Sequence, residues 1–142
     1  MPDQTSTRST VIPGMHYRNA PEAIEWLCQV FGFEKHAVHA GSDNTILHAE
    51  LTLGGGMIML GSVNEQAPQR SMKLPRELGG AQTRGVYLIA QDADEIFTRA
   101  KAAGATIVEE IEDKPFGGRG FACLDPEGHI WHIGTYNPWP VK

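Results

Sequence analysis

The chain has 142 residues and a net charge of −5, and 41% of its residues are hydrophobic against 20% charged. This length and composition are typical of a globular protein that buries a core. The acidic balance, without any run of Lys and Arg, argues against nucleic-acid binding, which needs a basic face to neutralise phosphates. We therefore expect the partners to be a small-molecule ligand or a second copy of the chain.

Three features bear on the cellular compartment. No apolar run approaches the roughly 20 residues that a membrane-spanning helix needs, and the polar N-terminal residues lack the apolar segment of a signal peptide. The two cysteines, Cys28 and Cys123, each lie in an apolar, periodic segment, so we expect reduced core thiols and no disulfide. These features favour a cytoplasmic protein that does not interact with membranes.

The first half of the chain predicts a strand, a helix and three further strands. Residues 11–17 are typical of a short strand. Asn19 is a good helix cap, with a Pro and a Glu in the turn that follows, and Gly32 is a good helix stop. Between them an apolar stripe recurs at helical spacing: Ile24, Leu27, Cys28 and Phe31. Further strands are expected at residues 35–40, 45–53 and 57–60.

The strand expected at residues 45–53 alternates between apolar and polar side chains. His48 and Glu50 share its polar face. The opposite face should hold Leu47, Ala49, Leu51 and Leu53. The pattern predicts a half-buried strand with its histidine and glutamate directed away from the core.

The order of elements repeats after a polar segment at residues 64–84, which we expect to be a linker. Asp92 caps a second helix that ends at Gly104, and strands are expected at residues 85–90, 106–111, 121–124 and 129–136. The two helix caps are 73 residues apart and the two terminating glycines 72 residues apart. Because both spacings are close to half the chain, the sequence indicates a duplicated unit.

Two stretches of the sequence resemble a known family. The first is residues 12–20 (IPGMHYRNA), followed by IEW at 24–26 and VFGF at 30–33. The second is AGA at 103–105, FGGRGF at 116–121 and DPEGHIW at 125–131. Together they resemble the vicinal oxygen chelate superfamily, which is the glyoxalase/bleomycin-resistance/dioxygenase group, and especially its small bacterial PhnB-like members.

The resemblance implies an α+β fold. Two βαβββ modules would form curled antiparallel sheets around a cavity, with the helices outside. We expect a single domain spanning residues 1–142, with modules at 11–63 and 85–138 joined by the linker at 64–84. The resemblance also implies a homodimer.

Enzymes of this superfamily hold a divalent metal through His, Glu or Gln side chains on the first and last strands of both modules. In this sequence those positions fall on Ile12, on residues 57–60, on Gly85 and on His132. Only His132 can bind a metal, and a metal site normally needs three or four protein ligands. We therefore expect the family's metal site to be absent, and we expect no cofactor.

Six side chains are candidates for binding a ligand in the implied cavity: His16, His48, Glu50, Tyr87, Arg119 and His132. His16 and Tyr87 have the inward alternation of their strands, and Arg119 lies in a Gly-rich loop that could gate the cavity and meet an anionic ligand. Three readings of the polar side chains stay open. They could simply line a wet pocket, they could stand on an exposed face of the sheet, or His132, His48 and Glu50 could form a displaced metal site or an acid–base pair.

The leading hypothesis is a small-molecule-binding protein of this superfamily, without the usual metal site, that takes an apolar or aromatic ligand. One alternative is a lyase, isomerase or dioxygenase with an atypical divalent metal site. The other is a protein-interaction domain with a vestigial cavity. The sequence leaves open whether the protein is an enzyme and which ligand it takes.

Overall fold

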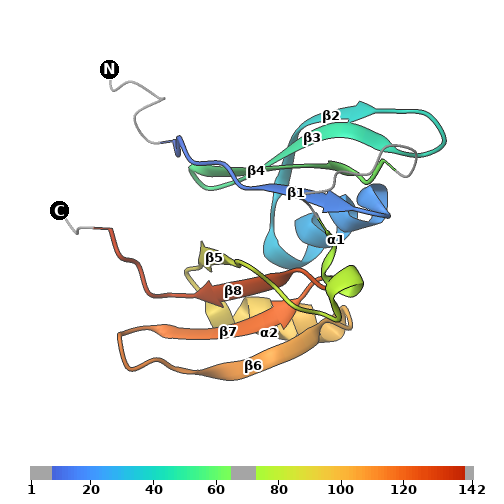
Figure 1. The fold of residues 1–142 in the computed structure, drawn as a ribbon. Helices are drawn as coiled ribbons and strands as arrows, with labels where there is room; N and C mark the ends of the chain where they lie inside the picture. The colour runs from blue at the N-terminus through green and yellow to red at the C-terminus, as the bar shows by residue number, and fades with distance from the viewer. Residues whose placement is uncertain (1–7, 65–72, 140–142) are drawn as a thin grey trace, which may run out of the picture. The chain divides into compact units, whose positions relative to one another are not determined.

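The chain divides into two compact units, Met1–Leu74 and Pro75–Lys142 (Figure 1). The computed structural model describes residues 8–64 and 73–139. The modules expected at 11–63 and 85–138 each fall inside one unit. In these residues no helix is long and apolar enough to cross a membrane.

The first unit contains one helix and a four-stranded sheet. In chain order the elements are β1 (Gly14–Tyr17), α1 (Ala20–Phe31), β2 (Glu34–Ala40), β3 (Ile46–Leu53) and β4 (Gly56–Ser62). The strands are arranged in the order β1-β4-β3-β2, with β1 parallel to β4 and the other neighbours antiparallel. Helix α1 packs on one face of this sheet, against β1, β3 and β4.

Helix α1 begins and ends where its local sequence dictates. The Asn19 side chain accepts a hydrogen bond from the backbone N–H of Glu22 at 3.3 Å, and its amide donates to the Glu22 carboxylate at 2.9 Å. The first of these bonds satisfies a backbone N–H that the first helical turn leaves open, and the second joins the two side chains to each other. Gly32 ends the helix with a φ of +89°, a conformation that favours glycine.

The second unit repeats the first with one additional short helix. Its elements are η2 (Pro75–Leu78), β5 (Val86–Ile89), α2 (Ala93–Ala102), β6 (Thr106–Asp113), β7 (Arg119–Leu124) and β8 (Ile130–Gly134). The strand order is β5-β8-β7-β6, with β5 parallel to β8, and α2 packs against β6, β7 and β8. The Asp92 side chain accepts from the backbone N–H of Glu95 and so caps α2, as expected.

The registers of the two sheets correspond strand by strand. Gly14 lies opposite Met59 across β1 and β4, and Tyr87 lies opposite His132 across β5 and β8. Both members of the second pair are 73 residues beyond those of the first. The expected α+β fold of two βαβββ modules is confirmed. The sheets are mixed, however. In each unit a helix follows the first strand, and the last strand lies beside that first strand and runs parallel to it.

One expected side-chain position in β3 is wrong. The pairing of β2 with β3 shifts between His39, which lies opposite His48, and Ala40, which lies opposite Ile46. Leu47 is therefore an extra residue on β3, and its side chain is 73% exposed. Ile46, at 8% exposure, takes the buried place. A β-bulge of this kind turns side chains to the other face of a sheet.

Part of the segment expected as a linker packs onto the second unit. Residues 65–72 lie outside the described part of the chain, whereas Arg76 donates to the carbonyl of Pro126 at 2.7 Å. The Gln82 side chain donates to the carbonyl of Gly128 at 2.5 Å and accepts from the N–H of Ile130 at 3.4 Å. Residues 75–82 therefore brace the turn that leads into β8.

That turn is held from inside by a buried carboxylate. The Oδ1 atom of Asp125 accepts from the backbone N–H groups of Glu127 and His129 at 3.0 and 3.1 Å. Its Oδ2 atom accepts from the indole N–H of Trp131 at 3.0 Å, and the Trp131 side chain is fully buried. Trp131 thus faces the core, so the neighbouring His132 on the same strand faces the opposite side of the sheet.

Candidate functional site

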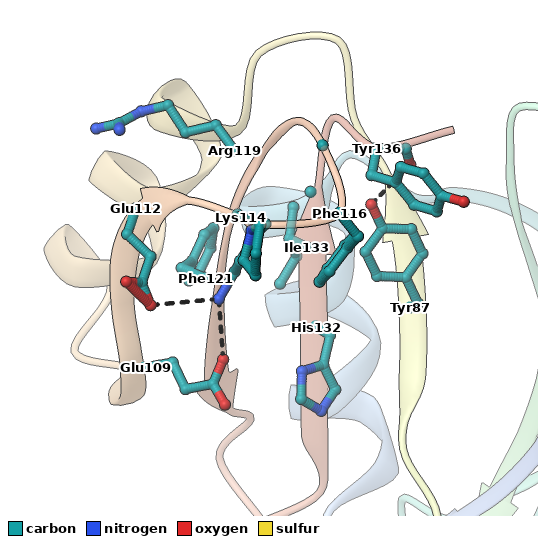
Figure 2. A pocket seen from close by; sticks show the side chains of 14 residues that line it. Tyr87, Glu109, Glu112, Lys114, Phe116, Arg119, Phe121, His132, Ile133 and Tyr136 are labelled. Atoms are coloured by element: carbon teal, nitrogen blue, oxygen red, sulfur yellow. Dashed lines mark hydrogen bonds and ion pairs between the residues drawn. The ribbon is translucent and has the colours of Figure 1, made fainter. Parts of the chain in front are cut away.

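The second unit contains a cavity of about 430 Å³. Figure 2 shows its walls, which come from all four strands, the loop between β6 and β7, and the segment after β8. Its labelled side chains are Tyr87, Glu109, Glu112, Lys114, Phe116, Arg119, Phe121, His132, Ile133 and Tyr136. This volume lies in the range that suits a small-molecule ligand.

The floor of the cavity is a row of side chains across the sheet. Glu109 lies opposite Ala122, Ala122 opposite His132, and His132 opposite Tyr87. Residues directly opposite each other on paired strands point to the same face. The register therefore places a carboxylate, an imidazole and a phenol on one side of the sheet, with the small Ala122 between the first two.

One wall of the cavity is aromatic. The rings of Phe116 and Tyr136 meet edge to face, with their centroids 5.2 Å apart. Tyr87 donates its hydroxyl to the backbone carbonyl of Tyr136 at 2.7 Å, and burial raises the pKa of Tyr87. Gly134 makes room for this ring, because a Cβ at that position would lie 2.7 Å from the Tyr87 hydroxyl oxygen. Three aromatic side chains are thus fixed beside one another at the edge of the cavity.

A tight loop holds Phe116 in this wall. Lys114 donates its backbone N–H to the carbonyl of Gly118 at 2.9 Å, and Gly117 donates back to the carbonyl of Lys114 at 3.1 Å. Gly118 has a φ of +72°, and a Cβ there would lie 2.6 Å from the backbone nitrogen of Tyr136. Only glycine allows this approach of the loop to the segment after β8.

The charged groups of the cavity form two separate sets. The Lys114 ammonium lies 3.3 Å from a carboxylate oxygen of Glu109 and 3.5 Å from one of Glu112. Arg119 extends away from the cavity in Figure 2, toward Asp94 at 2.9 Å and Asp113 at 3.3 Å. Its hydrogen bonds to these carboxylates, to Asp94 above all, raise the pKa of Arg119. The set that lies at the cavity therefore has two carboxylates and one cation, and its net charge is negative.

The first unit holds a second group of polar side chains. His48 lies 2.9 Å from Glu50 through Nε2 and Oε2, as their shared strand face predicts. His36 approaches the other carboxylate oxygen at 3.9 Å, and the ring of His39 stacks on that of His48 with centroids 6.1 Å apart. The hydrogen bond from His48 lowers the pKa of the Glu50 carboxyl. His16 lies on β1, where it pairs with Gly61 of β4.

The six expected site residues thus divide between the two units. Tyr87, Arg119 and His132 line the cavity of the second unit, and the guanidinium of Arg119 binds carboxylates. The other three, His16, His48 and Glu50, belong to the first unit. Their roles in ligand binding stay predictions.

Sequence reasoning missed several residues of both groups. The most informative misses are Glu109, Lys114, Phe116, Tyr136, His36 and His39. Phe116 carried a usable signal, because it stands in the Gly-rich loop expected to border the cavity. The histidines of β2 carried none, because their strand shows no clean alternation.

The positions of the family's metal ligands do not supply a ligand set. Ile12 is apolar, Met59 is the counterpart of His132 by register, and Gly85 has no side chain. A Cβ at Gly85 would lie 3.3 Å from the His132 ring, so the two positions adjoin, but the glycine offers no donor atom there. One imidazole does not meet the three or four donors of a divalent metal site.

The two-module fold agrees with a comparison to known families. The family model of the Glyoxalase/Bleomycin resistance protein/Dioxygenase superfamily matches residues 14–133. The chain belongs to this superfamily.

Individual relatives span a range of descriptions. An uncharacterized protein of Mycobacterium bovis is 34% identical over 126 residues, which cover 86% of this chain and 80% of that protein. The crystal structure of TioX from Micromonospora sp. ML1 matches with a TM-score of 0.71 and 34% identity, over 91% of this chain and 99% of that one. The 4-hydroxyphenylpyruvate dioxygenase of Caenorhabditis elegans is 31% identical over 122 residues, but the match covers only 30% of that enzyme.

Proposed function

We propose that the protein binds a small, planar aromatic ligand in the cavity of the second unit, without a metal at the family's positions. The observation that carries this proposal is the aromatic wall of Tyr87, Phe116 and Tyr136 beside a cavity of about 430 Å³. Aromatic rings recognise flat apolar groups through offset and edge-to-face contacts, each worth about 0.5–1.5 kcal/mol beyond the buried area. Membership of the superfamily supports a small-molecule role.

The charge around the cavity favours a cationic ligand. Among the ion pairs of the described residues at the cavity, Lys114 provides the cation. The two carboxylates beside it, of Glu109 and Glu112, carry more negative charge than its ammonium group can neutralise. A ligand cation could displace the ammonium from Glu109 or Glu112 and lie against the aromatic wall, where the ring faces attract positive charge. An anionic ligand would meet net negative charge instead.

The donor chemistry supports a ligand site that is independent of metal. Of the residues at the family's four positions, His132 alone offers a nitrogen donor, and Met59 offers only a weakly binding thioether. His132 instead provides a hydrogen-bonding group on the floor of the cavity. We propose that it contacts the ligand directly.

The test is a fluorescence titration of the full chain with two dyes that each have a flat tricyclic core, cationic proflavine and anionic fluorescein. We expect proflavine to bind at least about tenfold more tightly, a difference of about 1.4 kcal/mol. Phe116→Ala should weaken proflavine binding by a similar factor. Val108→Ala is the matched control, since Val108 is an exposed apolar residue of β6 outside the cavity lining. Equal affinity of the two dyes, or equal loss in both variants, would contradict the proposal.

A competing proposal is a lyase, isomerase or dioxygenase with an atypical metal site. The similarity to a dioxygenase over 122 residues favours it, as does the His48–Glu50 pair. It requires that replacing His132 and Glu50 with Ala abolish both metal uptake and turnover. Unchanged metal content in that double variant would reject it. A protein-interaction domain with a vestigial cavity is the third possibility, and it requires that no small molecule shift the melting temperature.

The proposed setting of this activity is a cytoplasmic homodimer. The superfamily and the acidic, reduced-thiol character of the chain support it. Light scattering of the purified chain measures the oligomeric state directly. A monomer at all concentrations would reject the dimer and leave the ligand proposal untouched.

A further inference from the structure

Lys114 occupies the charged end of the cavity in the second unit. Its ammonium lies 3.3 Å from a carboxylate oxygen of Glu109 and 3.5 Å from one of Glu112, and Figure 2 shows it between the two. The Lys114 side chain is 18% exposed, whereas those of the two glutamates are 49% and 63% exposed. The lysine is therefore the most enclosed of the three, and its side chain takes up space in the cavity lining.

A bulge in β6 turns both carboxylates to the cavity. Glu109 lies opposite Ala122 and Glu112 opposite Gly120, so three steps along β6 match two steps along β7. In a regular strand, residues three positions apart point to opposite faces of the sheet. The extra residue brings Glu112 back to the face of Glu109, because a bulge redirects the side chains that follow it. Both carboxylates consequently line the same cavity.

The neighbouring strand leaves room beside the two carboxylates. The residues opposite them on β7 are Ala122 and Gly120, which have the two smallest side chains. A Cβ at Gly120 would lie 2.7 Å from the carbonyl oxygen of Ile133, so the backbone contact excludes a larger residue there. At these two positions β7 therefore places no bulky group next to the glutamates, and a cation fits beside them.

The backbone of Lys114 is fixed, while its side chain can change rotamer. The N–H of Lys114 donates to the carbonyl of Gly118 at 2.9 Å, and its carbonyl accepts from the N–H of Gly117 at 3.1 Å. The ammonium stands at the end of a flexible four-carbon stem. Ion pairs with exposed carboxylates are weak, with an effect of at most about fivefold on an equilibrium. A competing cation can therefore replace the ammonium without a change in the loop backbone.

We propose that Lys114 is a built-in competitor for the cationic ligand. The inference rests on the proposed function and adds that the ammonium holds the place beside Glu109 and Glu112 that the ligand's own cation takes. Binding then exchanges one cation for another, so the ligand gains only the difference between the two sets of ion pairs. Removal of the lysine charge strengthens binding in this case, whereas removal of a direct ligand contact weakens it.

The exchange also narrows the class of ligand. A neutral aromatic molecule offers the carboxylates no charge in place of the ammonium, so it leaves Lys114 in position and contacts the aromatic wall alone. A compact cation on a flat ring system replaces the ammonium and also contacts the wall, since both features border one cavity. The geometry therefore favours aromatic amines and amidines that are protonated at neutral pH.

The test is a fluorescence titration of the full chain at pH 8 with proflavine and with acridine. Acridine has the same three-ring core as proflavine and is uncharged at this pH. We expect Lys114→Gln to bind proflavine about three- to fivefold more tightly than the parent, and to bind acridine as the parent does. Adding Glu109→Gln and Glu112→Gln to this variant should remove the gain, because the carboxylates supply the attraction.

Two control variants separate competition from a general effect of charge. Lys101→Gln changes the net charge of the chain by the same amount, at an exposed position of α2 outside the cavity lining. It should bind proflavine as the parent does. Lys114→Arg keeps a cation beside the two glutamates, so it should show no gain in proflavine affinity. Circular dichroism and the melting temperature of each variant establish that the fold is intact.

The outcomes separate this inference from the proposed function. If the parent binds proflavine but Lys114→Gln binds it no more tightly, the competitor role is wrong and the aromatic site stands. An equal gain in Lys101→Gln, or an equal gain with acridine, also rejects the role, because general charge or freed space then explains the result. If neither the parent nor Lys114→Gln binds either dye, both the proposed function and this inference fail.

Discussion

The buried carboxylate of Asp125 offers a sharp test of how the second unit is held together. Asp125→Asn keeps the shape of the side chain, and its remaining oxygen can still accept from the N–H groups of Glu127 and His129. Its new amide N–H groups, however, face the indole N–H of Trp131, which is fully buried. Two donors then meet, and the indole loses its acceptor.

The expected cost follows from this single lost bond. A hydrogen bond to a charged group contributes about 1.5–3 kcal/mol, and leaving a buried donor unsatisfied costs a similar amount. We take about 2 kcal/mol for Asp125→Asn. With an unfolding entropy of about 2.1 cal/mol/K per residue, this lowers the melting temperature of the chain by about 7 °C. Asp125→Ala removes the acceptor for all three donors, so its cost should be about twice as large.

The assay is urea unfolding followed by tryptophan fluorescence and circular dichroism, with Glu110→Gln as the control. Glu110 is an exposed carboxylate of β6, and its substitution should change stability by less than about 0.5 kcal/mol. Asp125→Asn within that same margin would refute the argument. It would mean that the Trp131 bond contributes nothing to the fixed position of β8.

Three further outcomes are expected. Gly134→Ala should push the Tyr87 ring aside and weaken proflavine binding several-fold. The free energy of unfolding should change by less than about 1 kcal/mol, because the ring is partly exposed. Equal binding of proflavine by the variant and the parent would show that Tyr87 is not part of the site. Burial raises the pKa of the Cys123 thiol to about 12, so little thiolate forms at about pH 8. A Cys28→Ser variant, which keeps only Cys123, should therefore react with a maleimide only after unfolding. Rapid labelling of the native variant would contradict this. Asn19→Ala should lower the unfolding free energy by about 1 kcal/mol in urea melts, and no change would mean that the cap contributes nothing.

The helices and the duplication could be predicted because their signals are local. Asn19 and Asp92 each cap a helix by accepting a hydrogen bond from the residue three positions later. Both partners therefore lie in one short stretch of sequence, where the pattern is easily seen. Gly32 and Gly104 both adopt positive φ after a helix. The similar spacings of these signals, 73 residues for the caps and 72 for the glycines, then indicate two copies of one unit.

The face of each side chain on β2 and β3 could not be predicted in full. Alternation assumes that every residue of a strand has one partner, and the extra residues His36 and Leu47 break that assumption. The position of a bulge depends on the partner strand, which the local sequence does not show. For this reason the pairing of His48 with Glu50 was predictable, whereas the approach of His36 and His39 was not.

The cavity was predictable only as a consequence of the family resemblance. His132 and Tyr87 follow from the alternation of their own strands. Glu109 joins them through the register of three strands, and Lys114 and Phe116 through a loop whose shape depends on the contact of Gly118 with Tyr136. Such contacts arise only once the sheet has formed.

The central claim is that an aromatic ligand binds within the second unit. A two-dimensional NMR titration of the isotope-labelled full chain with proflavine tests this claim most directly. We predict amide shift changes concentrated in residues 109–121 and 132–136, with those of β2 and β3 unchanged. Shift changes centred on β2 and β3, or none at saturating dye, would contradict the account.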